Sequence, residues 1–226
     1  MERIVGNTEQ ETWDQYNGLM LGPDIERIRK MLVRYDLFRQ SLSVPGDIVE
    51  CGVFKGVGAM YWAKLLAIYA PASRKRVVGF DTFSEFAVST LDYERDAAEK
   101  FTSEASFSGI EPSEIVSLAS AAGIEDRLEL VVGDVTETAL EYAQKQKGFR
   151  ISLLHLDLDT YLGTKAVLEA LFDRVTPGGI IVCDEYGTPE WGESDAIDEF
   201  LKDRDVTLKA VEFSAKPTAY FKKLNH

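Results

Sequence analysis

The sequence predicts an α/β protein with a doubly wound, mostly parallel, seven-stranded sheet that ends in an antiparallel strand pair. Five short apolar runs alternate with helical patterns, which is typical of a parallel sheet with helices on both faces. The last two strand-like runs, 206–213 and 218–224, have no helix between them. They are therefore expected to pair antiparallel at the end of the chain.

The expected elements follow one another in a regular order. An amphipathic helix is predicted over 23–40, where apolar residues recur at steps of three and four. Each parallel strand is a short, mostly apolar run that is followed by a glycine or an aspartate. These strands are 47–51, 77–80, 128–132, 151–156 and 180–183. The helices between them are 57–69, 113–122, 137–147 and 161–175.

The chain is expected to form one domain, 1–226, because its length favours a single core. Residues 1–44 are predicted to form an N-terminal helical cover. Residues 84–111 are polar and irregular, and they are much longer than the roughly 2–6 residues of an ordinary strand-to-helix connection. This segment is therefore predicted to be an insertion that serves as a lid over the active site.

Composition excludes several classes of partner. The formal charge is −13 and no dense basic run is present, so nucleic acid is not an expected partner. No segment has the leader pattern of a secreted protein or the ~20 apolar residues that span a bilayer. Only two cysteines occur, too few for a disulfide framework. We expect a cytoplasmic protein without membrane contact.

A glycine-rich turn follows the first strand, where doubly wound folds place their ligands. It reads ECGVFKGVG over 50–58, with an acidic residue two positions before the first glycine. This turn resembles motif I of the class I S-adenosylmethionine methyltransferases. The spacing is not the G-x-G-x-x-G of a dinucleotide site, which disfavours a dehydrogenase.

Aspartates end the next two strands. Asp81 has the lone pairs to accept hydrogen bonds from both ribose hydroxyls of such a cofactor. Asp134 stands where these enzymes meet the adenine amino group. The alternative for each aspartate is a cap on the turn that follows.

Four acidic side chains end the fourth and fifth strands: Asp157, Asp159, Asp184 and Glu185. Neighbouring parallel strands lie ~4.8 Å apart, so these carboxylates are expected to repel one another and to need a proton or a cation. Oxygen ligands select Mg²⁺, Ca²⁺ or Mn²⁺, and magnesium is the first choice. Alternatively, Asp159 caps the helix that follows and Glu185 points to solvent. His155 is read as a hydrogen-bonded core residue.

Taken together, these motifs resemble the macrocin O-methyltransferase family, metal-dependent enzymes that methylate sugar hydroxyls in antibiotics. The resemblance covers about residues 45–201. It rests on GDIVECGVFKG (46–56), FDTF (80–83), GDVTETAL (133–140), LDLDTYLGT (156–164) and TPGGIIVCDEYG (176–187) followed by AIDEFL.

The resemblance implies a Rossmann-like class I methyltransferase fold that uses S-adenosylmethionine and a divalent cation. Asp157, Asp184 and Glu185 are the implied metal ligands. The implied cofactor-binding residues are Glu50, Gly52, Val53, Phe54, Gly56, Gly58, Asp81, Thr82, Phe83, Asp134 and Val135. The acceptor is a hydroxyl of a small molecule, expected to be a sugar in a sugar nucleotide or a glycosylated natural product, and the protein is expected to be a homo-oligomer.

Two positions depart from the family pattern. The family has paired aspartates where this chain has Asp184 and Glu185, and an arginine near the position of His155. The related catechol-type enzymes use a lysine base where this chain has Thr160, which cannot take a proton. A carboxylate, Asp157 or Asp159, is therefore the expected catalytic base.

The acceptor site is the least determined part of the sequence. Aromatic residues able to stack on a ring occur near the N-terminus and in the insertion: Trp13, Tyr16, Phe86, Tyr93, Phe101 and Phe107. The alternatives are a phenolic or catechol-like acceptor, and a catalytically silent protein that binds S-adenosylmethionine.

Overall fold

The computed structural model describes residues 9–84, 91–104 and 111–224. It contains a seven-stranded sheet in the order β3-β2-β1-β4-β5-β7-β6. The first five strands are parallel, and β7 runs antiparallel to both β5 and β6. This order confirms the predicted doubly wound fold with its terminal antiparallel pair.

The parallel strands form where apolar runs were expected. They are β1 (Asp47–Cys51), β2 (Val77–Asp81), β3 (Leu128–Val132), β4 (Ile151–Leu156) and β5 (Val175–Cys183). β5 begins five residues before the predicted strand, which started at 180, because Val175 already pairs with Ile151. β6 (Lys209–Ala210) and β7 (Ala219–Lys222) are shorter than the sequence indicated.

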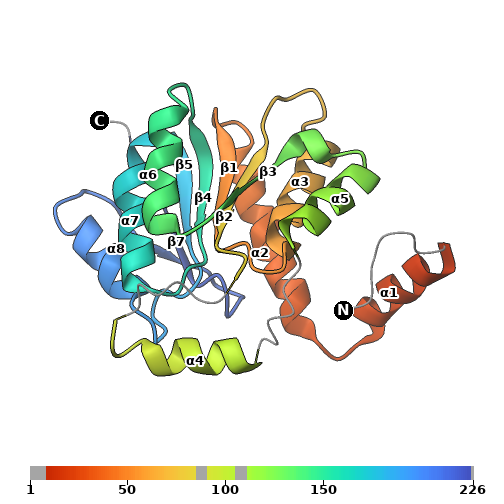
Figure 1. Cartoon of the computed structure of the whole chain (residues 1–226), viewed down its shortest axis with the longest axis horizontal. Helices are drawn as coiled ribbons and strands as arrows, with labels where there is room; N and C mark the ends of the chain where they lie inside the picture. Colours follow the sequence, from red (N-terminus) through yellow and green to blue (C-terminus); the bar gives the residue numbers. More distant parts are fainter. Residues whose placement is uncertain (1–8, 85–90, 105–110, 225–226) are drawn as a thin grey trace.

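Helices cover both faces of the sheet, with one core on each face (Figure 1). α2 (Ile25–Ser41), α3 (Val57–Tyr69) and α5 (Pro112–Ala121) pack on one face around Trp62 and Phe38. α6 (Val135–Lys145), α7 (Tyr161–Leu171) and α8 (Glu193–Leu201) pack on the other face around Leu154. Alternate residues of each strand face opposite cores, as period-2 geometry requires.

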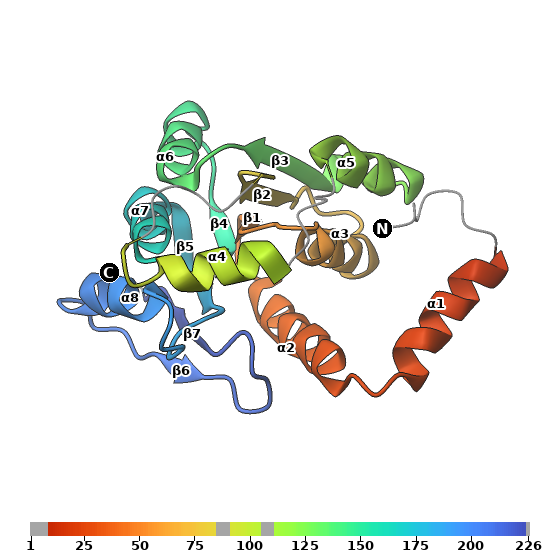
Figure 2. The same ribbon diagram turned by 60° about the horizontal axis from the view of Figure 1, so that its bottom comes forward.

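Three helices were absent from the sequence prediction or only broadly anticipated. α8 lies between β5 and β6, where no helix was assigned. α4 (Arg95–Glu104) lies inside the segment expected to be irregular. α1 (Glu9–Leu21) lies apart from the sheet in both views (Figures 1 and 2), and its side chains from Gln10 onward are exposed. Within the described part of the chain, no helix is long and apolar enough to cross a membrane.

At the carboxyl edge of the sheet, the turn after β1 touches the end of β4. Gly52 adopts a φ of +94°, and a Cβ at this position would lie 1.8 Å from the carbonyl oxygen of Asp157. The backbones approach this closely because Asp157 donates its N–H to the carbonyl of Cys51 at 2.9 Å. Only glycine satisfies both the conformation and the space.

Replacing Gly52 by alanine should lower the free energy of unfolding by at least about 2 kcal/mol, through both the collision and the unfavourable φ. Urea denaturation measures this change. Gly148→Ala is the matched control, since a Cβ there meets nothing within 4 Å; its effect should stay within about 0.5 kcal/mol. Equal stability of the two variants would contradict the close contact.

Candidate active site

Asp81 organises the first half of the site, at the end of β2. Its two carboxylate oxygens accept backbone N–H groups from Phe54 and Phe83, each at 2.7 Å. Phe54 and Phe83 have φ values of 51° and 53°, which are unusual for bulky residues. Such strained conformations persist where the surrounding structure fixes them and are common at functional sites. Asp81 stays half-buried, and its Oδ1 also lies 3.5 Å from the hydroxyl of Thr82, which donates to it.

Glu50 points into the protein. It is 1% exposed, and its Oε1 lies 3.3 Å from Nδ1 of His155 and 3.4 Å from Nε1 of Trp62. A Cβ on Gly58 would lie 2.0 Å from the same oxygen, so glycine at 58 makes room for Glu50. Contact of Glu50 and Gly58 with a cofactor stays a prediction.

Asp134 takes the capping role that the sequence left open. Its carboxylate accepts the N–H of Thr136 at 2.9 Å and the hydroxyl of Thr136 at 2.7 Å, and it is the N-cap of α6. Val135, the next residue, is buried at the first position of the helix. A second role for Asp134 at the adenine of a cofactor stays a prediction.

The second half of the site is an acidic cluster at the ends of β4 and β5. Atoms of His155, Asp157 and Asp184 that could bind a metal all lie within 4.8 Å of one another. His155 is buried, and its Nε2 lies 3.1 Å from Oδ1 of Asp184. His155 thus joins Asp184 to Glu50, which confirms its reading as a hydrogen-bonded core residue.

Two cations from α2 enter this cluster. Nζ of Lys30 lies 3.1 Å from Oδ2 of Asp184 and 3.8 Å from Oδ2 of Asp157. The guanidinium of Arg34 lies 3.4 Å from Oδ2 of Asp157 and 3.7 Å from Oε1 of Glu50. The sequence prediction missed both residues because it sought compensating charge only near β4. Their i, i+4 spacing beside the apolar stripe of α2 was the available signal.

Glu185 lies outside this cluster. It is 1% exposed, accepts the Thr188 hydroxyl at 2.7 Å and forms an ion pair with Lys216. The alternative that it points to solvent is therefore wrong. Among the described residues, the candidate metal ligands that the structure brings together are His155, Asp157 and Asp184, without Glu185.

Asp159 adopts a φ of 63° directly after the cluster. It does not cap α7: the cap is Thr160, whose hydroxyl accepts the N–H of Gly163 at 3.4 Å. The predicted alternative of a capping role for Asp159 is therefore wrong. Its backbone carbonyl accepts the N–H of Glu193 at 3.1 Å, which connects the end of β4 to α8.

The carboxylates of the cluster differ in pKa and therefore in charge. Burial and the charge of Asp184 raise the pKa of Asp157 to about 6, and burial and the charge of Asp157 raise the pKa of Asp159 to about 7. Burial acts to raise the pKa of Asp184 as well, but the hydrogen bond from His155 and the charges of His155 and Lys30 hold it well below its usual range. The cluster therefore retains negative charge on Asp184 and favours further positive charge.

This donor set fits a hard divalent cation at Asp157 and Asp184. Both offer carboxylate oxygens, the ligands that Mg²⁺, Mn²⁺ and Ca²⁺ prefer. The side chain of Asp157 is 24% exposed, so the site opens to solvent. The ammonium of Lys30 already lies against one oxygen of each aspartate, as a cation would.

Part of the predicted lid crosses the same edge of the sheet. Figure 2 shows α4 in front of the strand ends, between α7 and α3. Glu94, fully buried, accepts the N–H groups of Tyr161 at 2.7 Å, Gly192 at 3.0 Å and Leu91 at 2.8 Å. It thereby joins the start of α4 to the N-terminal ends of α7 and α8.

The candidate aromatic residues lie in different parts of the structure. Phe101 of α4 packs on Phe54 of the glycine turn, with ring centroids 5.6 Å apart. Trp13 and Tyr16 lie on α1, away from the strand ends (Figure 2). Tyr93 adjoins Gly192, where a Cβ would lie 2.4 Å from its hydroxyl. Phe86 and Phe107 lie outside the described residues.

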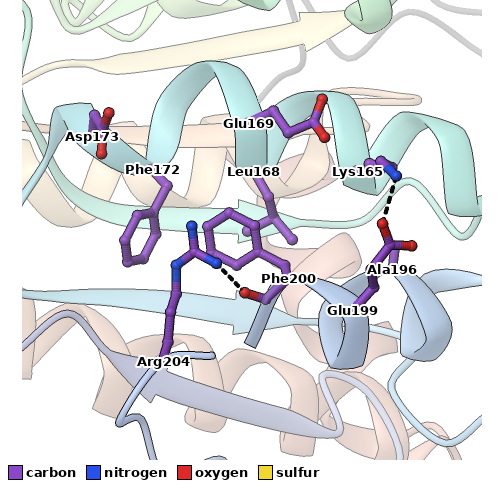
Figure 3. A pocket seen from close by; sticks show the side chains of 9 residues that line it. All are labelled: Lys165, Leu168, Glu169, Phe172, Asp173, Ala196, Glu199, Phe200 and Arg204. Carbon is purple, nitrogen blue, oxygen red and sulfur yellow. Dashed lines mark hydrogen bonds and ion pairs between the residues drawn. The ribbon is translucent and has the colours of Figure 1, made fainter. Parts of the chain in front are cut away.

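A groove of about 340 Å³ between α7 and α8 does not belong to this site (Figure 3). Three of its charged side chains already have partners within the groove. Lys165 pairs with Glu199 at 2.7 Å, and the guanidinium of Arg204 stacks 3.8 Å from the ring centroid of Phe200 and donates to the Phe200 carbonyl. None of its lining residues belongs to the acidic cluster or to the glycine turn.

Comparison with solved structures gives the same fold. A calicheamicin methyltransferase, CalS11, matches with a TM-score of 0.76 and 30% identity, over 96% of this chain and 87% of that chain. Its apo structure, described as a TDP-rhamnose 3'-O-methyltransferase, matches with a TM-score of 0.73 and 31% identity, over 96% and 88%. The O-methyltransferase NovP matches with a TM-score of 0.72 at 19% identity, over 88% and 81%, which shows the fold alone.

Sequence comparison finds relatives among curated O-methyltransferases. Mycinamicin III 3''-O-methyltransferase of Micromonospora griseorubida is 27% identical over 75% of this chain. A tetracenomycin-C rhamnosyl 4'-O-methyltransferase of Streptomyces olivaceus is 28% identical over 63% of this chain. The matches span 65% and 54% of the length of these two relatives. The sequence profile of the macrocin O-methyltransferase (TylF) family matches residues 13–223, so the chain belongs to the macrocin O-methyltransferase family.

Proposed function

We propose that the protein is an S-adenosylmethionine-dependent O-methyltransferase that acts on a hydroxyl of a sugar, in a sugar nucleotide or a glycosylated natural product. The observation that supports the proposal is the arrangement of two groups of residues around β1 in a chain of this family. The glycine turn and Asp81 lie on one side, and the acidic cluster lies on the other. Two relatives are named for rhamnose or a rhamnosyl group, which supports a sugar acceptor. The buried free thiols of Cys51 and Cys183 suit a reducing compartment, and we place the reaction in the cytoplasm.

The cofactor is proposed to bind at the glycine turn and Asp81. The carboxylate of Asp81 would accept the ribose hydroxyls beside the N–H groups of Phe54 and Phe83, and at Oδ1 a ribose hydroxyl would take the place of the long contact from the Thr82 hydroxyl. The remaining predicted contacts, Val53, Gly56 and Thr82, lie on the same two turns. Because these residues lie at the ends of β1 and β2 and in the turns that follow, we expect cofactor binding not to require a charged acidic cluster.

Methyl transfer is proposed to occur beside the acidic cluster. The acceptor oxygen attacks the sulfonium methyl group, the new C–O bond forms as the C–S bond breaks, and S-adenosylhomocysteine leaves. Asp157 or Asp159 takes the hydroxyl proton as the oxygen attacks. Alignment of the oxygen, the methyl carbon and the sulfur supplies much of the acceleration.

A divalent cation, with Mg²⁺ as the first choice, is proposed at Asp157 and Asp184. When bound, it lowers the pKa of the acceptor hydroxyl. Glu185 is the third ligand that the family resemblance implies, and it would have to leave Lys216 and Thr188 to serve. His155 and Arg34 hold Asp184 and Asp157 in place through the contacts described above.

Residues 84–111 are proposed to cover the acceptor, as part of a single domain over 1–226. Glu94 anchors α4 at α7 and α8, and Phe101 places the other part of the helix against Phe54. α4 thus reaches from the acidic half of the site to the cofactor half. Water exclusion beneath it would strengthen the electrostatic interactions of the site.

The protein is further proposed to form a homo-oligomer through α1 and the start of α2. Eight exposed large apolar side chains lie within this short region: Trp13, Tyr16, Leu19, Met20, Leu21, Ile25, Met31 and Leu32. A concentration of this kind on one part of a surface is typical of a protein interface.

S-adenosylmethionine should raise the melting temperature, because it binds the folded state. Asp81→Ala should weaken its binding by ~1–3 kcal/mol, through the loss of charge-assisted hydrogen bonds. Calorimetry measures both proteins. Asp126→Ala, which removes a carboxylate that is 79% exposed, is the control and should bind as the parent does. A melting curve that the cofactor does not move would contradict the assignment.

Chelation with EDTA should stop methyl transfer to a TDP-sugar, and Mg²⁺ should restore it, while cofactor binding survives. Asp157→Asn and Asp184→Asn should each reduce turnover by roughly a hundredfold or more, because they remove charged oxygen ligands. Asp205→Asn, at an exposed position, is the control. Full activity in EDTA would refute the metal, and transfer to catechols but not to sugars would favour the phenolic alternative.

Asp159→Asn separates the two candidate bases. If Asp159 takes the proton, turnover falls by about 10²–10⁴-fold while metal affinity stays unchanged. Unchanged turnover assigns the proton to Asp157. Single-turnover methyl transfer and metal titration of the same preparation give both quantities.

Glu94→Ala should raise the KM for the acceptor and speed tryptic cleavage at Arg95, because three N–H groups that are buried or partly buried lose their acceptor and α4 loses its anchor. Binding of S-adenosylmethionine should change much less. Glu99→Ala, on the exposed side of the same helix, is the control. A KM equal to that of the parent would show that α4 does not cover the acceptor.

A further inference from the structure

The ammonium of Lys30 contacts two carboxylates of the acidic cluster. Its ammonium lies 3.1 Å from Oδ2 of Asp184 and 3.8 Å from Oδ2 of Asp157, so it bridges the two carboxylates. These carboxylates are the proposed ligands of the divalent cation. Lys30 belongs to α2, more than a hundred residues earlier in the chain.

We propose that Lys30 is a tethered competitor of the divalent cation, so that metal binding requires its side chain to leave the cluster and Lys30 sets the metal affinity. The proposal rests on the metal site of the proposed function. It assigns a role to a residue outside the motifs that mark the family resemblance.

The divalent cation and the ammonium of Lys30 cannot occupy the cluster at the same time. A magnesium ion binds carboxylate oxygens at about 2.0–2.1 Å, and Ca²⁺ at about 2.3–2.6 Å. An ion that bridges Asp157 and Asp184 would therefore lie in the space now next to the ammonium of Lys30. Two cations so close repel strongly at the edge of a protein core, where water screens them poorly.

Lys30 is able to leave, whereas Arg34 is not. The side chain of Lys30 is 27% exposed and has a flexible stem that reaches solvent. The side chain of Arg34 is 9% exposed, pairs with Glu50 and lies over the Trp62 ring at 5.8 Å. The apolar contacts of Val33, Leu37 and Phe38 hold α2 in place while the lysine moves.

Lys30 stabilises the acidic cluster in the metal-free protein. Without a cation, Asp157 and Asp184 would repel each other at a poorly solvated site. Lys30 neutralises part of this charge and keeps both carboxylates at the positions that a metal needs. The cost is a weaker metal affinity, because each metal ion has to displace the ammonium.

The test measures Mn²⁺ binding to the metal-free full-length chain, from the EPR signal of free Mn²⁺. Lys30→Met should bind Mn²⁺ about tenfold more tightly than the parent, because the competing charge is gone. Arg27→Met is the control: it removes one positive charge from the same helix at a side chain that is 74% exposed, and its affinity should match the parent. Unchanged or weaker binding by Lys30→Met, or no Mn²⁺ binding by either protein, would overturn the proposal.

Thermal denaturation provides a readout that a merely structural lysine would not produce. Metal-free Lys30→Met should melt below the parent, and saturating Mn²⁺ should raise its melting temperature by more than it raises that of the parent. Equal increases in the two proteins would contradict competition. Lys30→Gln, which keeps a polar side chain, repeats both measurements if Lys30→Met does not fold.

Cofactor calorimetry on the same preparations keeps the two proposals apart. A parent protein that binds no S-adenosylmethionine, but whose Mn²⁺ affinity rises on Lys30→Met, would refute the proposed function and support the role of Lys30. A parent that binds the cofactor while Lys30→Met leaves the Mn²⁺ affinity unchanged would support the cofactor site and overturn the role of Lys30.

Discussion

The structure depends on the compensation of buried negative charge at the carboxyl edge of the sheet. Glu50, His155 and Asp184 are each 1% exposed or less, and they form one chain of contacts across β1, β4 and β5. A buried carboxylate without a partner costs several kcal/mol, so none of these groups is stable at its position without its neighbours. Arg34 completes the chain from the helix that covers them. The charged contacts of Lys30 and Arg34 therefore add to the apolar contacts that hold α2 on the sheet.

Because of this constraint, the glycine turn has a role in the fold as well as in ligand binding. Its pattern predicts close approach to a ligand, but two of its glycines first admit the chain's own groups. Gly52 admits the backbone of Asp157, and Gly58 admits the carboxylate of Glu50. A Cβ at either position would displace part of the charged network before it met a cofactor. The glycine turn thus packs directly against the acidic cluster, and a substitution at either glycine would disturb the fold and the site together.

The sequence predicts the local features of this protein and misses the long-range ones. β1 and β3 were predicted with their observed bounds, since an apolar run between polar turns carries its own signal. The positions of Asp81, Asp157 and Asp184 followed from the strand ends. Lys30 and Arg34 were missed because their partners lie on distant strands, and Glu94 because it acts on the backbone of α7 and α8. Glu185 was expected in the cluster because it follows Asp184, but it lies in the bend after β5 and pairs with Lys216.

The strand order also places the residues proposed for cofactor binding and those proposed for chemistry on opposite sides of β1. β1 lies between β2, which carries Asp81, and β4, which carries Asp157. With strands ~4.8 Å apart, the two aspartates are separated by roughly 10 Å across the end of β1. A ligand held by Asp81 at one end must cross the turn at Gly52 to bring its other end to the acidic cluster. The backbone of that turn, where Phe54 contacts Phe101 of α4, is the path along which a cofactor anchored on one side would present a reactive group to an acceptor on the other.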